Sequence, residues 1–390
     1  MADGTHIQWT NATWNLLTGC TLVDHGCDHC YAARLAATRL QHHPSRAGLT
    51  RVNAAGVAKF TGEVRFNEQW LDQPLRWTKP RRIFVCAHGD LFHESVPDDW
   101  IDQAFAVMAL APQHTFQVLT KRPERAREYF RETKGWRSRI AGLLNDMKPS
   151  PLWNGNVYQG WQNLHGRPDG LPNVWLGTSI SDQSSADARI PELLACPAAV
   201  RFVSAEPLLG PVDLTRVGNL AAIDNVFPTL ATPHRRDMAP EPISGAQIDA
   251  INGAGSSCLF YQTPNHMGGF SWEFPRRFPR LDWVICGGES GPGARPMHPD
   301  WARSLRDQCV AAGVPFFFKQ WGEWGAGDGL GDEVDGCQFG CFDDAGQWVY
   351  PVDQDWATRD RLVMFRVGKK TAGRVLDDRT WDQMPGAKDA

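Results

Sequence analysis

The sequence predicts an α/β protein, built as a partial (β/α) barrel of about six to seven units with a small C-terminal β appendage. Short apolar runs that resemble buried strands alternate with amphipathic helical patterns along the chain, and polar residues follow those runs directly. Such alternation is typical of a parallel sheet covered on both faces. A doubly wound open sheet is the alternative architecture.

The segment that follows residue 81 shows how one unit is recognised. Residues 82–87 (RIFVCA) predict a buried strand, and a loop and then a helix from about Pro97 follow. Two aspartates in the first turn of that helix suit its dipole. The remaining strands are expected at 115–120, 173–178, 200–205, 281–287 and 314–319, with a first, irregular one at about 6–10.

The domain organisation follows from where the alternation of strand and helix patterns stops. Residues 1–214 and 281–324 form the predicted barrel core. Residues 215–280 contain Pro, Gly and His without a clear period, which indicates an insertion or lid. Residues 325–390 begin Gly-rich and continue with two strand-like pieces, which predict the small β appendage and a basic loop at 368–371.

Charge and hydropathy exclude some classes of protein. The formal charge is −4, from 40 basic and 44 acidic residues, so charge alone does not predict a protein that coats nucleic acid. A local basic groove remains compatible with this balance. No apolar run is long enough for a membrane span, and no signal peptide is visible, so we expect a cytoplasmic protein without a membrane partner.

The strongest local motif is a trio of cysteines, Cys20, Cys27 and Cys30, within GCTLVDHGCDHCY. Three thiolates can hold three corners of a [4Fe–4S] cluster and leave the fourth iron open to an external ligand. Zinc is the main alternative, because His25 or His29 could complete a four-ligand site. Cys337 and Cys341 are a further candidate metal pair, which we interpret as ordinary thiols. The other cysteines are read as small buried hydrophobes: Cys86, Cys196, Cys258, Cys286 and Cys309.

The chain resembles the radical S-adenosylmethionine (SAM) superfamily, and more closely a phage-associated three-cysteine-motif family whose functions are largely unassigned. The resemblance rests on GCTLVDHGCDHCYA, GDLFHESVP, LTKRPERA, VWLGTSISDQ, RFVSAEPLLGP, DWVICGGESGPGARPM, SLRDQCVAAGVPFFFKQWGEW and GKKTAGRVLDDRTWDQMP. Six residues separate Cys20 from Cys27, whereas the usual superfamily motif has three. A longer loop costs little closure entropy.

The resemblance implies roles for residues at the predicted strand ends. Gly89 and Asp90 would meet the methionine amino group of SAM, and Ser179 the ribose hydroxyls. Lys121 and Arg122 would meet the methionine carboxylate or a substrate phosphate. The alternatives without a functional role are that Asp90 caps a loop, and that Lys121 and Arg122 lie at the solvent-exposed start of a helix.

Later strand ends would orient ribose or face the substrate. Glu206 is assigned to the cofactor, with simple pairing to a neighbouring arginine as its alternative. The other candidates, assigned to the substrate, are Glu289, Arg295, Lys319 and Gln320. Cationic residues expected along one face near the barrel mouth, where they would meet phosphates, are Lys121, Arg122, Arg125, Arg295, Lys319, Lys369 and Lys370.

These expectations combine into a functional hypothesis. The cofactors would be a [4Fe–4S] cluster and SAM, with an external electron donor of flavodoxin or ferredoxin type. The substrate would be a nucleobase in phage DNA, or a nucleotide, that is modified, rearranged or repaired. The alternatives are a zinc-stabilised nucleic-acid-binding protein and a radical SAM enzyme acting on a small metabolite or peptide.

Overall fold

The computed structural model describes most of the chain. The described residues are 4–131, 135–146, 157–165, 170–218, 248–252, 254–255, 261–264, 270–273, 279–326, 334, 336–350 and 362–386. Cys258 and most of the predicted insertion at 215–280 lie outside them.

A seven-stranded, all-parallel sheet forms the core. Its strands, in spatial order, are β1 (Ala12–Trp14), β6 (Arg82–Val85), β7 (Thr115–Thr120), β8 (Val174–Ile180), β9 (Val200–Ala205), β14 (Trp283–Gly287) and β15 (Phe316–Gln320). Within this sheet, each strand pairs with the next one along the chain, in parallel register. The order never reverses, so the sheet is a half-barrel and the doubly wound alternative is wrong.

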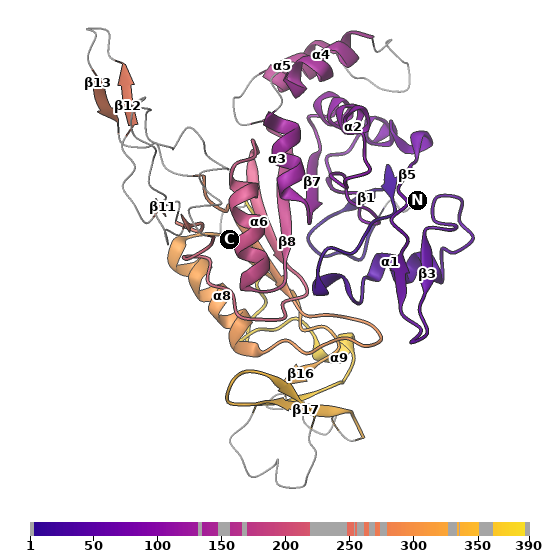
Figure 1. The fold of residues 1–390 in the computed structure, drawn as a ribbon, viewed down its shortest axis with the longest axis vertical. Helices are drawn as coiled ribbons and strands as arrows, with labels where there is room; N and C mark the ends of the chain where they lie inside the picture. The colour runs from indigo at the N-terminus through magenta and orange to yellow at the C-terminus, as the bar shows by residue number, and fades with distance from the viewer. Residues whose placement is uncertain are drawn as a thin grey trace, which may run out of the picture.

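Helices connect consecutive strands of this sheet, except between β9 and β14, where the described elements are short strands (Figure 1). They are α1 (Tyr31–Ala37), α2 (Asp98–Leu110), α3 (Pro123–Arg131), α4 (Trp136–Asp146), α5 (Val157–His165), α6 (Gln183–Leu194) and α8 (Pro299–Ala312). Helix α8 ends at Gly313, whose φ of 63° is the left-handed conformation that suits glycine at a helix end. The predicted partial-barrel fold class is confirmed.

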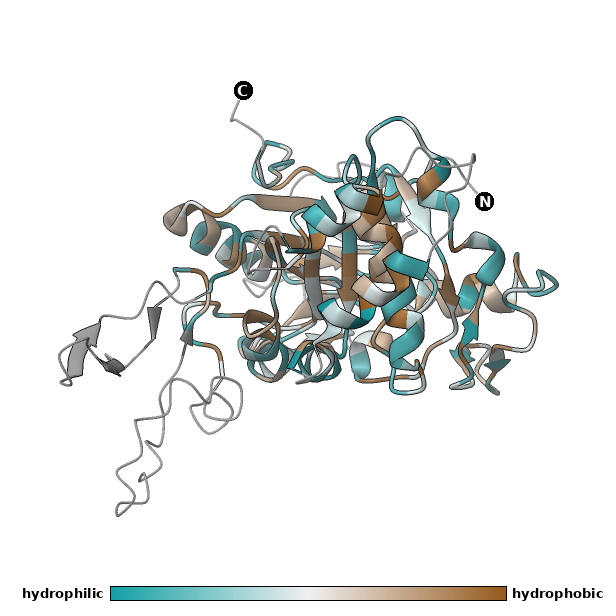
Figure 2. Ribbon diagram, turned by 90° about the horizontal axis from the view of Figure 1, so that it is seen from above, coloured by the Kyte–Doolittle hydropathy of each residue, from teal (hydrophilic) through white to brown (hydrophobic). Residues whose placement is uncertain are grey.

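The two faces of the sheet carry different cores. The outer face packs against the helices in one large apolar cluster that contains Phe116, Val203 and Phe316. The inner face carries a smaller, aromatic cluster: Trp9, Phe84, Ala87, Phe202, Trp283, Ile285 and Phe317. Alternate side chains of each strand therefore face opposite cores. Apolar residues concentrate in the central strands, and hydrophilic residues on the surrounding helices and loops (Figure 2).

The first strand lies later than predicted. The structure places β1 at Ala12–Trp14, whereas the sequence pattern suggested 6–10. Ile7 and Trp9 instead pack onto the aromatic inner face, and both line the cavity described below. Their apolar side chains produce a strand-like pattern although they do not enter the sheet.

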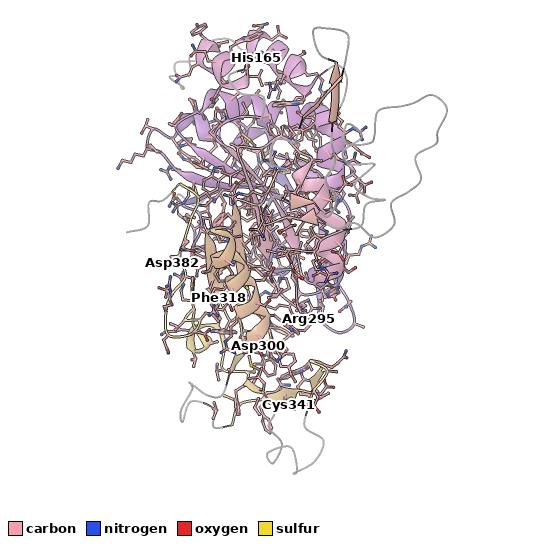
Figure 3. The ribbon with its side chains drawn as sticks, turned by 90° about the vertical axis from the view of Figure 1, so that its left-hand side faces the viewer. His165, Arg295, Asp300, Phe318, Cys341 and Asp382 are labelled. Atoms are coloured by element: carbon pink, nitrogen blue, oxygen red, sulfur yellow. The ribbon has the colours of Figure 1, made fainter. Side chains whose placement is uncertain are left out.

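The tail is divided between two places. A four-stranded sheet forms the small β appendage, from β16 (Gly325–Ala326), β17 (Phe339–Phe342), β18 (Trp348–Val349) and β19 (Val363–Phe365). It contains Cys341 and lies at the opposite end of the molecule from His165 (Figure 3). A short helix, α9 (Lys369–Ala372), follows, and the chain then returns to the core.

That return caps the last strand of the half-barrel. The Phe318 amide donates to the Trp381 carbonyl at 2.8 Å, and the Trp283 indole donates to the Gln383 carbonyl at 2.9 Å. Leu376 and Trp381 join the outer core, while Met384 packs on the inner face. Residues 374–384 thus belong with the barrel, although the sequence suggested one appendage over 325–390.

Smaller elements complete the described structure. The short strands pair as β2 (Leu17–Thr18) with β5 (Arg65–Phe66), β3 (Thr50–Val52) with β4 (Ala58–Phe60), β10 (Ile248–Asp249) with β11 (Ala254–Gly255), and β12 (Tyr261–Pro264) with β13 (Phe270–Glu273). The 3-10 turns are η1 (His25–Cys27), η2 (Glu68–Trp70) and η3 (Gln73–Arg76). Ala250 and Ile251 are buried in the outer core. None of the helices in the described part of the chain has the length and apolar character to cross a membrane.

Candidate functional site

A cavity of about 660 Å³ lies at the carboxyl ends of the parallel strands. All but one of the predicted site residues line it, namely Cys20, Cys27, Cys30, Gly89, Asp90, Lys121, Arg122, Ser179, Glu206, Glu289, Lys319 and Gln320. The exception is Arg295. Because strand ends of a parallel sheet meet at one edge, residues far apart in sequence converge here.

The cysteine loop is fixed at its start to the end of β6. The Gly19 amide donates to the His88 carbonyl at 3.1 Å, and Gly19 forms an isolated parallel bridge with Gly89. Gly19 has φ 98°, and a Cβ there would collide with the Glu63 carbonyl. Both features require glycine. Cys20 is thereby placed directly beside Gly89 and Asp90.

Two cations hold the middle of the loop through Asp24. Lys121 Nζ lies 3.2 Å from Asp24 Oδ1, and Arg189 binds Oδ2. Burial opposes ionisation of this carboxyl, but Lys121 and Arg189 outweigh it, so the pKa of Asp24 falls below its usual value. Arg189 also donates to the Ser179 carbonyl at 2.7 Å. The loop is therefore tied to the ends of β7 and β8.

A second pair of cations holds the loop through Asp28. Lys59 Nζ lies 3.0 Å from Asp28 Oδ1, and Arg295 Nη1 lies 3.5 Å from Oδ2. Arg295 also donates to the His25 carbonyl at 2.9 Å and pairs with both oxygens of Glu289. Arg295 lies towards the end of the core that faces the appendage (Figure 3). It secures the cysteine loop rather than lining the cavity.

Loosening the Asp24 attachment is expected to expose the thiols. In Asp24→Asn, Lys121 and Arg189 lose their shared counter-charge, so we expect several-fold faster alkylation of Cys27 and Cys30 in metal-free protein, measured by mass spectrometry. Asp28→Asn should have a smaller effect, because Asp28 is 43% exposed against 17% for Asp24. Equal rates in Asp24→Asn and the parent would contradict the role given to these ion pairs.

Arg122 and Asp90 form a buried pair beside Cys20. Arg122 Nη1 lies 3.1 Å from Asp90 Oδ2 and 3.7 Å from Cys20 Sγ, and its side chain is 10% exposed. Burial raises the pKa of Cys20 to about 12, and Asp90 adds to this shift while Arg122 opposes it. Arg122 thus lies on the cysteine side of the cavity, and it is not a solvated helix start.

Both Asp90 oxygens are fully used by the protein. Oδ1 accepts from the Thr120 hydroxyl at 2.7 Å and from the Phe92 amide at 3.0 Å. Oδ2 accepts from the Lys121 amide at 3.1 Å as well as from Arg122. Asp90 therefore caps its loop, as the alternative suggested, and it also anchors Arg122.

Glu206 forms an ion pair with a lysine, whereas the alternative drawn from the sequence was a pair with a neighbouring arginine. Its Oε1 lies 2.8 Å from Lys319 Nζ, and its Oε2 accepts from the Ser204 hydroxyl at 3.0 Å. Both charged side chains are largely buried, at 13% and 20% exposure. The pair joins the ends of β9 and β15 at the cavity wall.

The loops after β14 and β15 cross in backbone contact. A Cβ on Gly288 would overlap the Trp321 carbonyl, and one on Gly322, which has φ 88°, would overlap the Glu289 carbonyl. The Glu323 amide donates to that same Glu289 carbonyl at 3.0 Å. This crossing fixes Glu289 at the rim of the cavity.

Gly288→Ala is expected to destabilise the protein strongly, because backbone atoms have to move to admit the methyl group. We expect a loss of several kcal/mol, roughly the upper range for single substitutions. The matched control is Gly142→Ala within α4, where the methyl meets open space and should be neutral or stabilising by about 0.5–1 kcal/mol. Urea unfolding measures both, and equal stability of the two variants would contradict the crossing.

The three cysteine thiols lie close enough in the cavity wall to interact electrostatically. Burial raises the pKa of the Cys30 thiol, Cys27 adds to the shift, and the amides of Ala32 and Ala33 oppose it. Within the described ranges, no three His, Cys, Asp or Glu side chains converge closely enough to surround one metal ion. The three thiols line one cavity.

Comparison with known proteins places the chain in a family. A family model described as "Protein of unknown function (DUF5131)" matches residues 4–385. The chain belongs to the DUF5131 family. No curated protein and no solved structure matches it. The family description assigns no activity, so the chemistry of this DUF5131 protein has to be argued from its own residues.

Several residues that build the candidate site of the DUF5131 chain were not predicted from the sequence. Asp24, Asp28 and Arg189 hold the cysteine loop, and Trp9 lines the cavity. The acidic residues inside the cysteine loop were visible, but their partners were not. Among the cations expected at the barrel mouth, Lys369 lines the cavity, whereas Arg125 pairs with Asp98 instead.

Proposed function

We propose that this DUF5131 protein is a radical SAM enzyme, and that Cys20, Cys27 and Cys30 hold a [4Fe–4S] cluster at the mouth of the half-barrel. The observation that supports this most is that all three thiols line one cavity together with the polar ends of the parallel strands. A cavity of this position and size is where such folds bind cofactor and substrate.

The three cysteines line one cavity together with His29, and a cluster and a zinc ion would use these donors differently. Zinc requires four ligands around one centre, and the described His, Cys, Asp and Glu side chains provide no group of three. A cubane takes each cysteine at a different iron, so its ligands are spaced by the cluster itself. When bound, the cluster supplies one electron that cleaves SAM to methionine and a 5′-deoxyadenosyl radical, which abstracts hydrogen from an unactivated carbon.

The chain's own residues position the cofactor and exclude water. Gly89 lines the cavity at the start of the cysteine loop, so we assign it to the methionine amino group. Asp90 acts on the cofactor only indirectly, because its carboxylate oxygens already accept hydrogen bonds from Arg122 and the Lys121 amide. Ser179, which is 7% exposed and lines the cavity, is assigned to the ribose. The aromatic inner face forms the dry floor that radical chemistry requires.

We further propose a nucleobase, in DNA or in a nucleotide, as the substrate, with a flavodoxin- or ferredoxin-type protein as electron donor in the cytoplasm. The aromatic residues of the cavity, Trp9 and Phe84, offer flat surfaces on which a base can stack. Cations at the strand ends suit phosphate.

Anaerobic reconstitution tests the proposed function. We expect a brown protein with about four irons per chain, and formation of 5′-deoxyadenosine from SAM after reduction with dithionite. Colourless protein with one bound zinc, or an iron-loaded protein that leaves SAM intact, would refute the proposal.

A further inference from the structure

One part of the cavity is built from the end of β15, the end of β9 and the short helix α9. Lys319 and Gln320 come from β15, Glu206 follows β9, and Lys369 opens α9. The Lys319–Glu206 ion pair described above uses Oε1 of Glu206, and the Ser204 hydroxyl donates to Oε2. The direct ion pair of Glu206 in this part of the cavity is therefore made with Lys319.

Lys369 supplies a further positive charge in this part of the cavity. The backbone on each side of α9 is bonded to the core, since the Gly368 amide donates to the Glu323 carbonyl at 3.0 Å and the Trp321 amide donates to the Gly373 carbonyl at 3.1 Å. Lys369 forms no ion pair with any described residue. Burial, followed by the charge of Lys319, lowers the pKa of Lys369, while Glu206 and Glu323 oppose the shift.

Two buried polar atoms of residues that line the same cavity have no hydrogen-bond partner among the described groups. Gln320 is 5% exposed, and its Oε1 has no hydrogen-bond partner among the described groups. Trp9 is 2% exposed, and its indole N–H is likewise unpaired. Buried polar atoms are costly unless bonded. An unpaired acceptor and an unpaired donor in a cavity that two lysines also line are typical of a ligand site.

We propose that Lys319 and Lys369 bind the phosphate of a nucleotide unit, while Gln320 and Trp9 contact its base. The inference rests on the proposed function, because it assigns the substrate's place in the same cavity. Glu206 pairs directly with Lys319, whereas Lys369 pairs with no described carboxylate and so is available to an anion. The C-terminal segment therefore completes the site by adding Lys369 to residues of the half-barrel.

The test measures binding by the whole chain, without SAM or reductant. Calorimetric titration compares the four deoxynucleoside 5′-monophosphates, the matching deoxynucleosides and a short single-stranded DNA. We expect at least one phosphate-bearing probe to bind, and its nucleoside to bind roughly tenfold more weakly or worse. Preference for the monophosphate indicates a free nucleotide, and preference for the oligonucleotide, with a steep salt dependence, indicates DNA.

Matched variants locate the phosphate. Lys369→Gln should weaken binding of that probe by roughly tenfold or more, and Lys369→Arg should restore most of it. Lys370→Gln is the control, because both lysines are exposed but only Lys369 lines the cavity. Equal losses in Lys369→Gln and Lys370→Gln, nucleosides that bind as tightly as nucleotides, or no binding of any probe would overturn the inference.

These outcomes separate the inference from the proposed function. Failed nucleotide binding in a chain that still cleaves SAM overturns the phosphate site alone. Nucleotide binding that depends on Lys369, in a chain that takes up no iron, overturns the radical chemistry and leaves the phosphate site standing.

Discussion

Replacing Cys27 with alanine is expected to abolish SAM cleavage and to remove most of the bound iron. A cluster held by two protein thiolates has two open irons and is readily lost, because each cysteine binds a different corner. Cys20→Ala and Cys30→Ala should behave alike, since all three thiols line the same cavity. Iron per chain after anaerobic reconstitution and 5′-deoxyadenosine yield are the two measurements.

The control for this series is Cys337→Ala. Cys337 is half-buried in the appendage and does not line the cavity, so its loss should leave iron content and 5′-deoxyadenosine yield unchanged. Retention of about four irons in Cys27→Ala would show that the trio does not hold the cluster. Loss of iron in Cys337→Ala would instead revive the second metal pair with Cys341.

Removing Arg122 is expected to cost about 3–5 kcal/mol of stability in the metal-free protein. The substitution Arg122→Met leaves the Asp90 carboxylate, which is 6% exposed, without its counter-ion. A buried carboxylate without a paired charge is far more costly than a lost surface pair. Urea unfolding followed by circular dichroism measures the change.

Two companion variants make the Arg122 result specific. Arg125→Met breaks the pair with Asp98, in which the side chains are 25% and 31% exposed, so its cost should stay near or below about 1 kcal/mol. The double variant Asp90→Asn/Arg122→Met should recover part of the lost stability, because the buried carboxylate is gone and Glu94, the other acidic partner of Arg122, is 60% exposed. A double variant less stable than Arg122→Met would contradict the burial argument.

The regular parts of the fold could be predicted because local pattern and tertiary structure agree there. The expected strands at 115–120 and 200–205 coincide with β7 and β9, where apolar runs end in polar residues. Helix α8 lies between the Pro299 and Gly313 that delimit it in the sequence. The early strand was misplaced because Trp9 is buried against the inner face, which local pattern cannot distinguish from pairing in a sheet.

Predicting the candidate site was limited by long-range pairing. Strand-end position correctly brought Asp90, Ser179 and Lys319 to one cavity, because that argument needs only the topology. The attachment of the cysteine loop could not be foreseen, since Asp24 and Arg189 lie 165 residues apart. Arg295 has the charge of a substrate ligand, and only the fold shows that it faces Asp28 and His25.

Residues near both ends of the described chain pack against the inner face of the half-barrel. Ile7 packs there from the N-terminal side and Met384 from the C-terminal side, and Lys369 reaches the cavity only once the tail has folded back. During synthesis on the ribosome, the pocket stays incomplete until these last residues have emerged. A chain that stopped before Lys369 would therefore lack one of the residues that line the cavity.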